Sequence, residues 1–415
     1  MQQFHILSFE GPDAYSRAGG IGTRIAGLFE ALVDAEIETH LWFVGEPDAP
    51  GYVMDGFGHL HRWCQWISRH HPCGVYDGED GKAKDYARSL APCLVEEWMG
   101  PQLMAGGRAV VLAEEWHTVD AVLHLDWLLR RLGLRDRVVL LWNANNTFGF
   151  HRIDWSRLSK AAIITTVSRY MKQIMSAAGV DALVIPNGLD KEVLARPDPE
   201  AVRTFRREHG DRVLLAKMAR FDRDKRWMFA VKCVDLLKRR GLKPLLVARG
   251  GTEPYGAEVM DAARGLGLKV VERTLDGAGA EGLVRALRGC EDVEVLHLRS
   301  HLDCDARRVL FRAADAVLAN SSHEPFGLVG LEAMAAGGLA CTGCSGEDYA
   351  VPGRNALVLQ TEDPNEFVAL YRPLRASFGA ARAVRRAGRA TARDFAWPRV
   401  VSGNLLPRVR LAGAV

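Results

Sequence analysis

Two glutamates with seven residues between them, Glu324 and Glu332, form the clearest chemical pattern in the sequence. A strand-like run at 316–319 precedes them, and a helix is predicted to begin near Gly327. The first backbone amides of a helix have no partner within it, so this end attracts an anion such as a diphosphate. Glu332 lies further along the same helix and could accept hydrogen bonds from ribose hydroxyls. The amides expected at the anion are those of Phe326, Gly327 and Leu328.

A basic loop follows another strand-like run, which begins at Val213. Its Arg220 and Lys225 suit a diphosphate, because arginine offers a bidentate fork and lysine a point charge. Both would also stabilise negative charge on a departing nucleotide. A solvated basic loop, which is how we interpret Arg223 and Arg226, would have the same composition. The nearby glutamate pair favours the phosphate-binding interpretation for Arg220 and Lys225.

A glycine-rich turn lies between the first strand-like segment and the first predicted helix. It contains Arg17, Gly19, Gly20 and Gly22, whose glycines permit positive φ and close approach of the backbone to a phosphate or sugar. A dinucleotide-binding turn needs the spacing GxGxxG, but the third position counted from Gly20 is Ile25. The turn therefore favours a phosphate or sugar over a dinucleotide.

Polar side chains follow two further strand-like runs in this half of the chain. His117 comes after the run 110–113, at the carboxyl end where ligands bind in parallel sheets. Asn143 and Asn145 close the run that begins at Val138 and could bind sugar hydroxyls of an acceptor. The alternatives stay open, since a lone histidine is usually structural and the asparagines could equally cap a loop.

The sequence gives little indication of a metal site, a nucleic-acid partner or a membrane segment. The pairs His59/His61 and His70/His71 have no nearby carboxylate or cysteine pattern of zinc spacing, so we expect no metal site. The charge is only +3, from 54 Lys and Arg against 51 Asp and Glu, and indicates no nucleic-acid partner. Eight scattered cysteines suit reduced thiols, and neither a signal peptide nor a long apolar run is visible. We expect a cytoplasmic protein without a transmembrane segment.

Strand-like and helical segments alternate along the chain, which predicts βαβ units and parallel sheets. A turn-rich stop at 186–190 divides this alternation into two series, and 415 residues exceed one ordinary core. We therefore predict an α/β protein of two doubly wound Rossmann-like domains, 1–190 and 191–397, facing across a cleft. The tail, about 398–415, is expected to pack back on the first domain. Residues 51–85 are interpreted as an irregular insertion.

The string Glu324-Pro-Phe-Gly-Leu-Val-Gly-Leu-Glu332-Ala-Met resembles the EX7E motif of GT-B glycosyltransferases in its GT4 form. This resemblance implies that Glu324 faces the donor sugar, that Glu332 binds ribose, and that Arg220 and Lys225 hold the diphosphate. The turn Gly19-Gly20-x-Gly22 is similar to one in glycogen and starch synthases, which have a lysine at the position of Arg17. The string Glu115-Trp-His117-Thr is similar to another motif of these synthases, in which the histidine contacts the transferred sugar. Arg17 and Gly20 would then meet the donor from the opposite wall.

The resemblance implies a retaining transferase that moves a hexose, with glucose favoured, from a nucleoside-diphosphate sugar to a hydroxyl of a small acceptor. It implies no metal or other cofactor, and catalytic roles for Glu324, His117, Arg220 and Lys225. A front-face reaction needs no protein nucleophile, although Glu324 as a nucleophile stays open. The alternatives are an epimerase or phosphorylase of the same fold, or a non-catalytic nucleotide-sugar sensor. The base, the donor sugar, the acceptor, the linkage and the oligomeric state are not specified.

Overall fold

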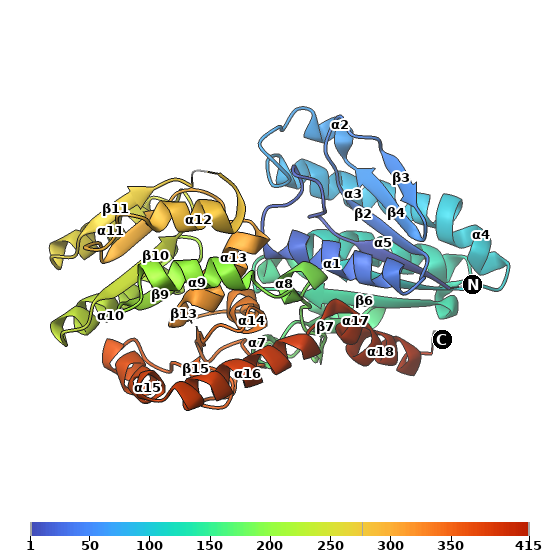
Figure 1. Cartoon of the computed structure of the whole chain (residues 1–415). Helices are drawn as coiled ribbons and strands as arrows, with labels where there is room; N and C mark the ends of the chain where they lie inside the picture. The colour runs from blue at the N-terminus through green and yellow to red at the C-terminus, as the bar shows by residue number, and fades with distance from the viewer. Residues whose placement is uncertain (1, 276, 414–415) are drawn as a thin grey trace. The chain divides into compact units, whose positions relative to one another are not determined.

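The computed structural model describes residues 2–275 and 277–413, and the chain divides into two compact units. One unit runs to Gly188 and includes the chain from Trp397 onward, and the other is Leu189–Ala396. Each unit is built on one mainly parallel sheet with helices packed against it (Figure 1). This confirms the predicted α/β class and the two Rossmann-like domains. Among the described residues, no helix is both long and apolar enough to cross a membrane.

The first unit contains an eight-stranded sheet in the order β3-β4-β2-β1-β5-β6-β7-β8. All neighbours are parallel except β3 and β4, which are antiparallel. The strands are β1 (Gln2–Leu7), β2 (Thr39–Val44), β3 (Tyr52–Asp55), β4 (Gly58–Trp63), β5 (Arg108–Glu114), β6 (Val138–Ala144), β7 (Ile163–Thr166) and β8 (Leu183–Val184).

The first unit also contains nine α-helices among its described residues, the last two of which come from the end of the chain. They are α1 (Gly20–Asp34), α2 (Gln65–Ser68), α3 (Glu79–Cys93), α4 (Met99–Met104), α5 (Val119–Arg131), α6 (Trp155–Ala161), α7 (Arg169–Ala177), α17 (Trp397–Val400) and α18 (Leu406–Leu411). Short helical turns complete them: η1 (Leu94–Trp98), η2 (Trp116–Thr118), η3 (Arg135–Arg137), η4 (Phe150–Arg152) and η6 (Val401–Leu405). Side chains alternate along β1, so Phe4 and Ile6 pack with α1 and the C-terminal helices while His5 contacts Trp42 on the other face.

Most of the segment 51–85 consists of strands and helices, with turns at 69–78, so its interpretation as an irregular insertion is wrong. It forms β3, β4, α2 and the start of α3, and β4 pairs in parallel with β2. Its buried side chains include His59 and His61. The polar sequence of β4 therefore does not show the apolar pattern expected of a strand in the core sheet. No carboxylate or cysteine pattern of zinc spacing stands near His59 in the sequence, but the fold places Glu38 beside His40 and His59.

The second unit contains a seven-stranded parallel sheet in the order β11-β12-β10-β9-β13-β14-β15. Its strands are β9 (Val213–Met218), β10 (Pro244–Arg249), β11 (Val270–Arg273), β12 (Val295–Leu298), β13 (Ala316–Ala319), β14 (Ala340–Thr342) and β15 (Leu357–Val358). Its helices are α8 (Lys191–Leu194), α9 (Pro199–Glu208), η5 (Arg223–Lys225), α10 (Trp227–Arg239), α11 (Tyr255–Gly265), α12 (Gly279–Leu287), α13 (Cys304–Ala313), α14 (Leu328–Ala335), α15 (Pro364–Ala376) and α16 (Phe378–Asp394).

The C-terminal helices belong to the core of the first unit. Val400, Val401, Leu405 and Val409 are buried in the same apolar cluster as α1. Trp397 packs so closely on Gly188 that a Cβ atom at position 188 would lie 2.3 Å from the Trp397 ring. The chain from Trp397 onward therefore stabilises the first unit by burying apolar surface against α1 and β1.

Candidate functional site

Two loops of the second unit meet because the strands before them are neighbours in the sheet. β9 pairs with β13, so the loops that follow their carboxyl ends, 219–226 and 320–327, lie side by side. Lys225 Nζ lies 3.0 Å from Glu324 Oε2, and the Ser321 hydroxyl donates to the same oxygen at 3.0 Å. The Ser322 amide donates to the Asp224 carbonyl at 2.8 Å and fixes one loop on the other. Lys225 and Glu324, 99 residues apart, are thus brought together.

The Lys225–Glu324 pair is partly open to solvent. The two side chains are 16% and 23% exposed, and Asp224 lies 3.2 Å from the same ammonium. Burial lowers the pKa of Lys225, but Glu324 and Asp224 outweigh it, so the net pKa is raised and the ammonium stays charged. A charged lysine at the end of a flexible stem can exchange a carboxylate for a phosphate oxygen.

Arg220 lies in the same loop with its side chain 74% exposed and paired with Asp222 at 3.2 Å. Its backbone carbonyl accepts a hydrogen bond from Trp227 Nε1 at 2.8 Å, which anchors the loop to α10. The expectation that Arg226 is solvated is wrong, because its side chain is only 12% exposed and pairs with Glu362. Arg223 is exposed and pairs with Glu258. Arg220 and Arg223 are thus both exposed and each pairs with one acid, and only the partner of Arg220, Asp222, lies in the loop itself.

The start of α14 lies close to the predicted position. Gly327 has φ +78°, a left-handed conformation that favours glycine, and a Cβ there would lie 2.6 Å from Glu347 Cγ. Leu328 begins the helix, whereas Phe326 is buried beside Tyr349 and Phe395, so only its backbone could meet a ligand. The Glu324 amide donates to Ser345 Oγ at 3.0 Å, which ties this turn to the loop after β14.

Glu332 lies on α14 and faces a neighbouring helix. Arg307 of α13 reaches its carboxylate at 3.2 Å, and the two side chains are 28% and 15% exposed. Burial raises the pKa of Glu332, and Arg307 acts in the opposite direction. The pair lines a small crevice with Cys304 and Phe311. A partly exposed carboxylate held by one arginine retains oxygens that can accept hydroxyl donors.

Sequence reasoning missed Glu347 in the loop after β14. Burial and then Glu324 raise its pKa to about 7, although hydrogen bonds from the Ser345 and Gly343 amides oppose the shift. One oxygen accepts from the Ser345 amide at 3.1 Å, and the other is buried without a hydrogen-bond partner. Because β14 is the next strand after β13 in the sheet, a scan of residues after every strand would have found this acid.

The glycine turn of the first unit is organised by Glu10, a second residue that the sequence did not indicate. Its carboxylate accepts from the amides of Ala18, Gly19 and Gly22 at 3.3, 3.1 and 2.9 Å, and Tyr76 donates to its other oxygen at 2.6 Å. The turn does not use positive φ, since among the described residues these glycines are not in that region. Gly19 and Gly20 face open space, and Arg17, Gly19 and Gly20 are exposed.

His117 follows β5, as expected from the sequence, and is buried among aromatic rings. It stacks on Phe9 and Trp116 at centroid distances of 4.1 and 3.9 Å. Its Nε2 lies 2.7 Å from Glu79, while its Nδ1 is buried without a hydrogen-bond partner. Burial lowers the pKa of His117, and Glu79 opposes the shift. The ring is held rigidly, with one nitrogen unused.

Asn143 belongs to a buried network, which revises its assignment to the acceptor. Its side chain is fully buried, donates to Glu114 at 2.8 Å and accepts from Thr165 at 2.9 Å. Asn145 is 8% exposed and donates to the same Glu114 oxygen at 2.7 Å. Arg24 completes the network with a 3.1 Å ion pair to Glu114. Because its side chain is fully used in these hydrogen bonds, Asn143 stabilises the ends of β5, β6 and β7. Of the two asparagines, only Asn145 is partly exposed.

Comparisons with known proteins support the fold. No protein-family model matches the chain. D-inositol 3-phosphate glycosyltransferase of Geodermatophilus obscurus is 27% identical over 246 residues, which are 58% of this chain and 50% of that protein. The match thus spans about half the length of that curated relative.

Solved structures match over the full chain at lower identity. Sucrose-phosphate synthase from Thermosynechococcus elongatus has a TM-score of 0.68 at 19% identity, covering 100% of both chains. A trehalose 6-phosphate synthase from Burkholderia multivorans has 0.63 at 14%, also covering 100% of both. HepE from Anabaena in complex with UDP has 0.63 at 14%, covering 99% of both. Together with the two parallel-sheet units, these matches show that the chain has the GT-B glycosyltransferase fold.

Proposed function

We propose that this chain is a retaining glycosyltransferase that moves a hexose from a nucleoside-diphosphate sugar to a hydroxyl of a small acceptor. The observation that carries the proposal is the Lys225–Glu324 pair, 3.0 Å apart at the carboxyl ends of neighbouring strands. Ligands of open parallel sheets bind at that edge. The name of the curated relative, a glycosyltransferase, supports the same activity.

The donor would bind to the second unit. Its diphosphate would exchange Lys225 away from Glu324, gain a bidentate contact from Arg220, and meet the backbone amides at the start of α14. Glu332, held by Arg307, would accept the ribose hydroxyls. Glu324, still held by the Ser321 hydroxyl, would then contact the sugar ring. Glucose is the favoured sugar, and UDP is the first nucleotide to test because a similar structure is a UDP complex.

The first unit would supply the remaining contacts. Arg17, Gly19 and Gly20 are exposed and would contact the donor, and His117 would contact the transferred sugar. Asn145 keeps its proposed acceptor contact through its small exposed edge. No metal is required, because Arg220, Lys225 and the helix start supply positive potential for the leaving diphosphate.

The reaction would proceed on the front face of the sugar. The bond from the anomeric carbon to the phosphate oxygen breaks, the acceptor oxygen bonds to the same face, and the acceptor proton passes to a phosphate oxygen. With the donor bound, Glu324 is still held by the Ser321 hydroxyl, which suits a carboxylate that orients the sugar and stabilises charge. This route would retain the anomeric configuration without a covalent intermediate.

Ligand binding and product analysis test the proposal. A thermal-shift screen with UDP, ADP and GDP and their glucose conjugates should raise Tm for one base, because a ligand that binds only the folded state stabilises it. The selected donor with hexose, hexose-phosphate and inositol-phosphate acceptors should then yield a glycoside whose anomeric configuration equals that of the donor, read by NMR. An inverted product would contradict retention. Free sugar or sugar phosphate alone would indicate the epimerase or phosphorylase class.

A further inference from the structure

Histidines occupy one register across three neighbouring strands of the first unit. His5 of β1 lies opposite His40 of β2, and His40 lies opposite His59 of β4. Glu38, just before β2, brings a carboxylate oxygen to the same place. Ligand atoms of Glu38, His40 and His59 lie within 4.8 Å of one another, which among the described residues makes them a candidate group for holding a metal ion.

The contact between His40 and Glu38 lacks a proper hydrogen bond. Nε2 of His40 is buried, has no hydrogen-bond partner, and lies 3.5 Å from Glu38 Oε1. The other ring nitrogen, Nδ1, lies 3.1 Å from His61 Nε2. If Nδ1 carries the proton that this second contact needs, the lone pair of Nε2 faces a carboxylate. A cation or a proton between these two atoms would relieve that repulsion.

The second nitrogen of each histidine is already partnered, as is usual for metal ligands. His59 Nδ1 lies 2.9 Å from the Tyr52 hydroxyl, and His40 Nδ1 is held by His61. Gln3 donates to Glu38 Oε1 at 2.8 Å and orients the carboxylate. Such contacts fix the tautomer and direction of metal-ligating side chains. They leave His40 Nε2 without a hydrogen-bond partner, and leave His59 Nε2 as the ring nitrogen that does not contact Tyr52.

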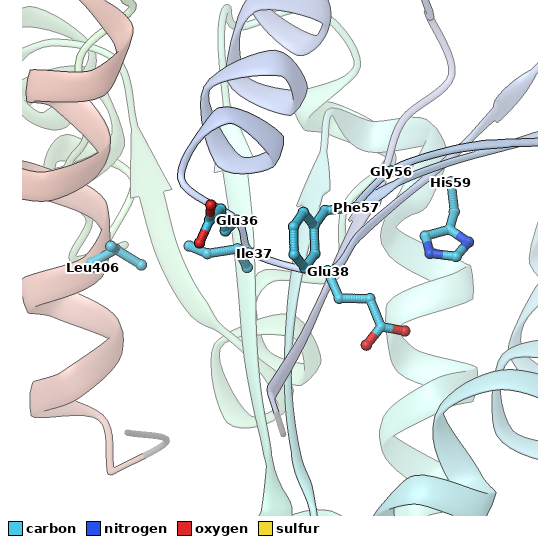
Figure 2. Close-up of a pocket in the computed structure, with 7 residues that line it drawn as sticks. All are labelled: Glu36, Ile37, Glu38, Gly56, Phe57, His59 and Leu406. Atoms are coloured by element: carbon cyan, nitrogen blue, oxygen red, sulfur yellow. The ribbon is translucent and has the colours of Figure 1, made fainter.

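An open pocket gives access to these residues. It has a volume of about 410 Å³, and Glu38 and His59 line it with Glu36, Phe57 and Leu406. In the view of Figure 2 the Glu38 carboxylate and the His59 ring lie on the same side of Phe57, and Leu406 lies on the other. An ion reaching Glu38 and His59 from this pocket could keep a water as its fourth ligand.

We propose that Glu38, His40 and His59 form a binding site for one divalent transition-metal ion with the ligand preference of Zn²⁺. Two imidazoles and a carboxylate are ligands that Zn²⁺ favours, at about 2.0–2.2 Å from the metal. The His40 and His59 rings stack with centroids 4.1 Å apart and planes inclined by 12°. His59 must therefore tilt out of this stack on binding, toward the pocket that it lines.

The position of this site indicates a role outside the proposed transfer reaction. It lies where β2 and β4 begin, at Thr39 and Gly58, whereas His117 and the asparagines follow the carboxyl ends of β5 and β6. An ion there would join the segment before β2 to β4 and stabilise this edge of the sheet. We therefore expect metal binding to change the stability of the fold and to leave glycosyl transfer unchanged.

Titration of the untagged, EDTA-treated and dialysed full chain with ZnCl₂ tests the site. Isothermal calorimetry should show a single tight Zn²⁺ per chain, and Zn²⁺ should raise Tm. Titration with Co²⁺ should give the intense visible bands of a tetrahedral ion. Glu38→Gln and His59→Gln should each weaken Zn²⁺ binding at least about tenfold, and Tyr52→Phe, which removes only the partner of His59, by about tenfold.

Glu36→Gln is the matched control, because Glu36 lines the same pocket without belonging to the ligand group. It should bind Zn²⁺ like the wild type. Circular dichroism of each variant without metal checks that it is folded, and the wild-type Co²⁺ spectrum is informative whatever the variants do. Absence of Zn²⁺ binding in the wild type would overturn the proposal and leave a proton between His40 and Glu38. Equal binding by Glu38→Gln, His59→Gln and wild type would overturn it by placing the ion elsewhere.

Discussion

Both units place charged side chains after the carboxyl ends of their strands, but the two sets differ in exposure. The Arg24–Glu114 pair of the first unit is 3.1 Å long with side chains 1% and 0% exposed. The Lys225–Glu324 pair of the second is 3.0 Å long with side chains 16% and 23% exposed. The buried pair is committed to internal hydrogen bonds with asparagines. The open pair could exchange a protein partner for a ligand, so two ion pairs of similar length differ in how much water reaches them.

The largest expected effect comes from breaking the buried pair. Glu114→Gln keeps the shape of the side chain but leaves the Arg24 guanidinium buried without its counter-charge, which costs about 3–5 kcal/mol. Urea denaturation should show this loss in the free energy of unfolding. Lys225→Met, which breaks the partly exposed pair, should cost less than Glu114→Gln, because water can still reach the Glu324 carboxylate. Similar losses in both variants would remove the distinction between the two pairs.

Glu347, which lies near Glu324, should make the free energy of unfolding depend on pH. Its folded pKa, about 7, lies above the ordinary 4.5, so it contributes stability below pH 4.5 that is lost as pH rises through 7. Glu347→Gln removes this loss, so the variant should gain up to about 3 kcal/mol relative to wild type across that range. Denaturation at several pH values measures the difference. A difference that does not vary with pH would show that Glu347 ionises like an exposed glutamate.

Short sequence motifs indicate candidate site residues only where a single segment contains the chemically active side chains. Glu324, Glu332, Arg220 and Lys225 are candidates in the sequence because each stands in a short pattern beside a strand or helix end. Their partners are not, since Arg307 and Glu347 come from separate elements that meet only in the folded sheet.

The first unit shows the same limit. Glu10 and the Arg24–Glu114 pair lack any pattern that distinguishes them, and the pair is formed by residues 90 positions apart. The polar strand β4 was missed because its histidines do not show the apolar alternation of an ordinary strand. Strand order and long-range contacts thus decide which polar residues are buried, and neither is visible in local composition.

Removing the proposed diphosphate contacts should reduce catalysis with little change in stability. Lys225→Ala and Arg220→Ala each delete a charge-assisted contact worth about 1.5–3 kcal/mol, so kcat/KM should fall about 10- to 150-fold. Arg223→Ala is the matched control in the same loop, because Arg223 is exposed and paired with Glu258. Turnover of Lys225→Ala or Arg220→Ala within about twofold of wild type would contradict the phosphate-binding assignment.

The two glutamates should separate binding from turnover. Glu332→Gln should weaken nucleoside-diphosphate affinity by about tenfold, since ribose hydroxyls lose a charged acceptor. Glu324→Gln should reduce turnover while changing nucleotide affinity less. Calorimetry with the free nucleotide and steady-state kinetics measure the two quantities. The reverse pattern would mean that the ribose and sugar assignments are exchanged.

The smallest expected effect is that of a chelator on transfer. In the proposed site, Arg220, Lys225 and the start of α14 would supply positive potential to a leaving diphosphate, so a cation there would be redundant. Assays with excess EDTA, run well below Tm, should give wild-type turnover even if the proposed zinc site in the first unit is emptied and Tm falls. A parallel assay of Glu38→Gln separates the two metal questions, because that variant should have the same turnover with and without EDTA. Loss of activity that Mg²⁺ or Mn²⁺ restores in both proteins would show that the protein's own cations do not suffice for the leaving group.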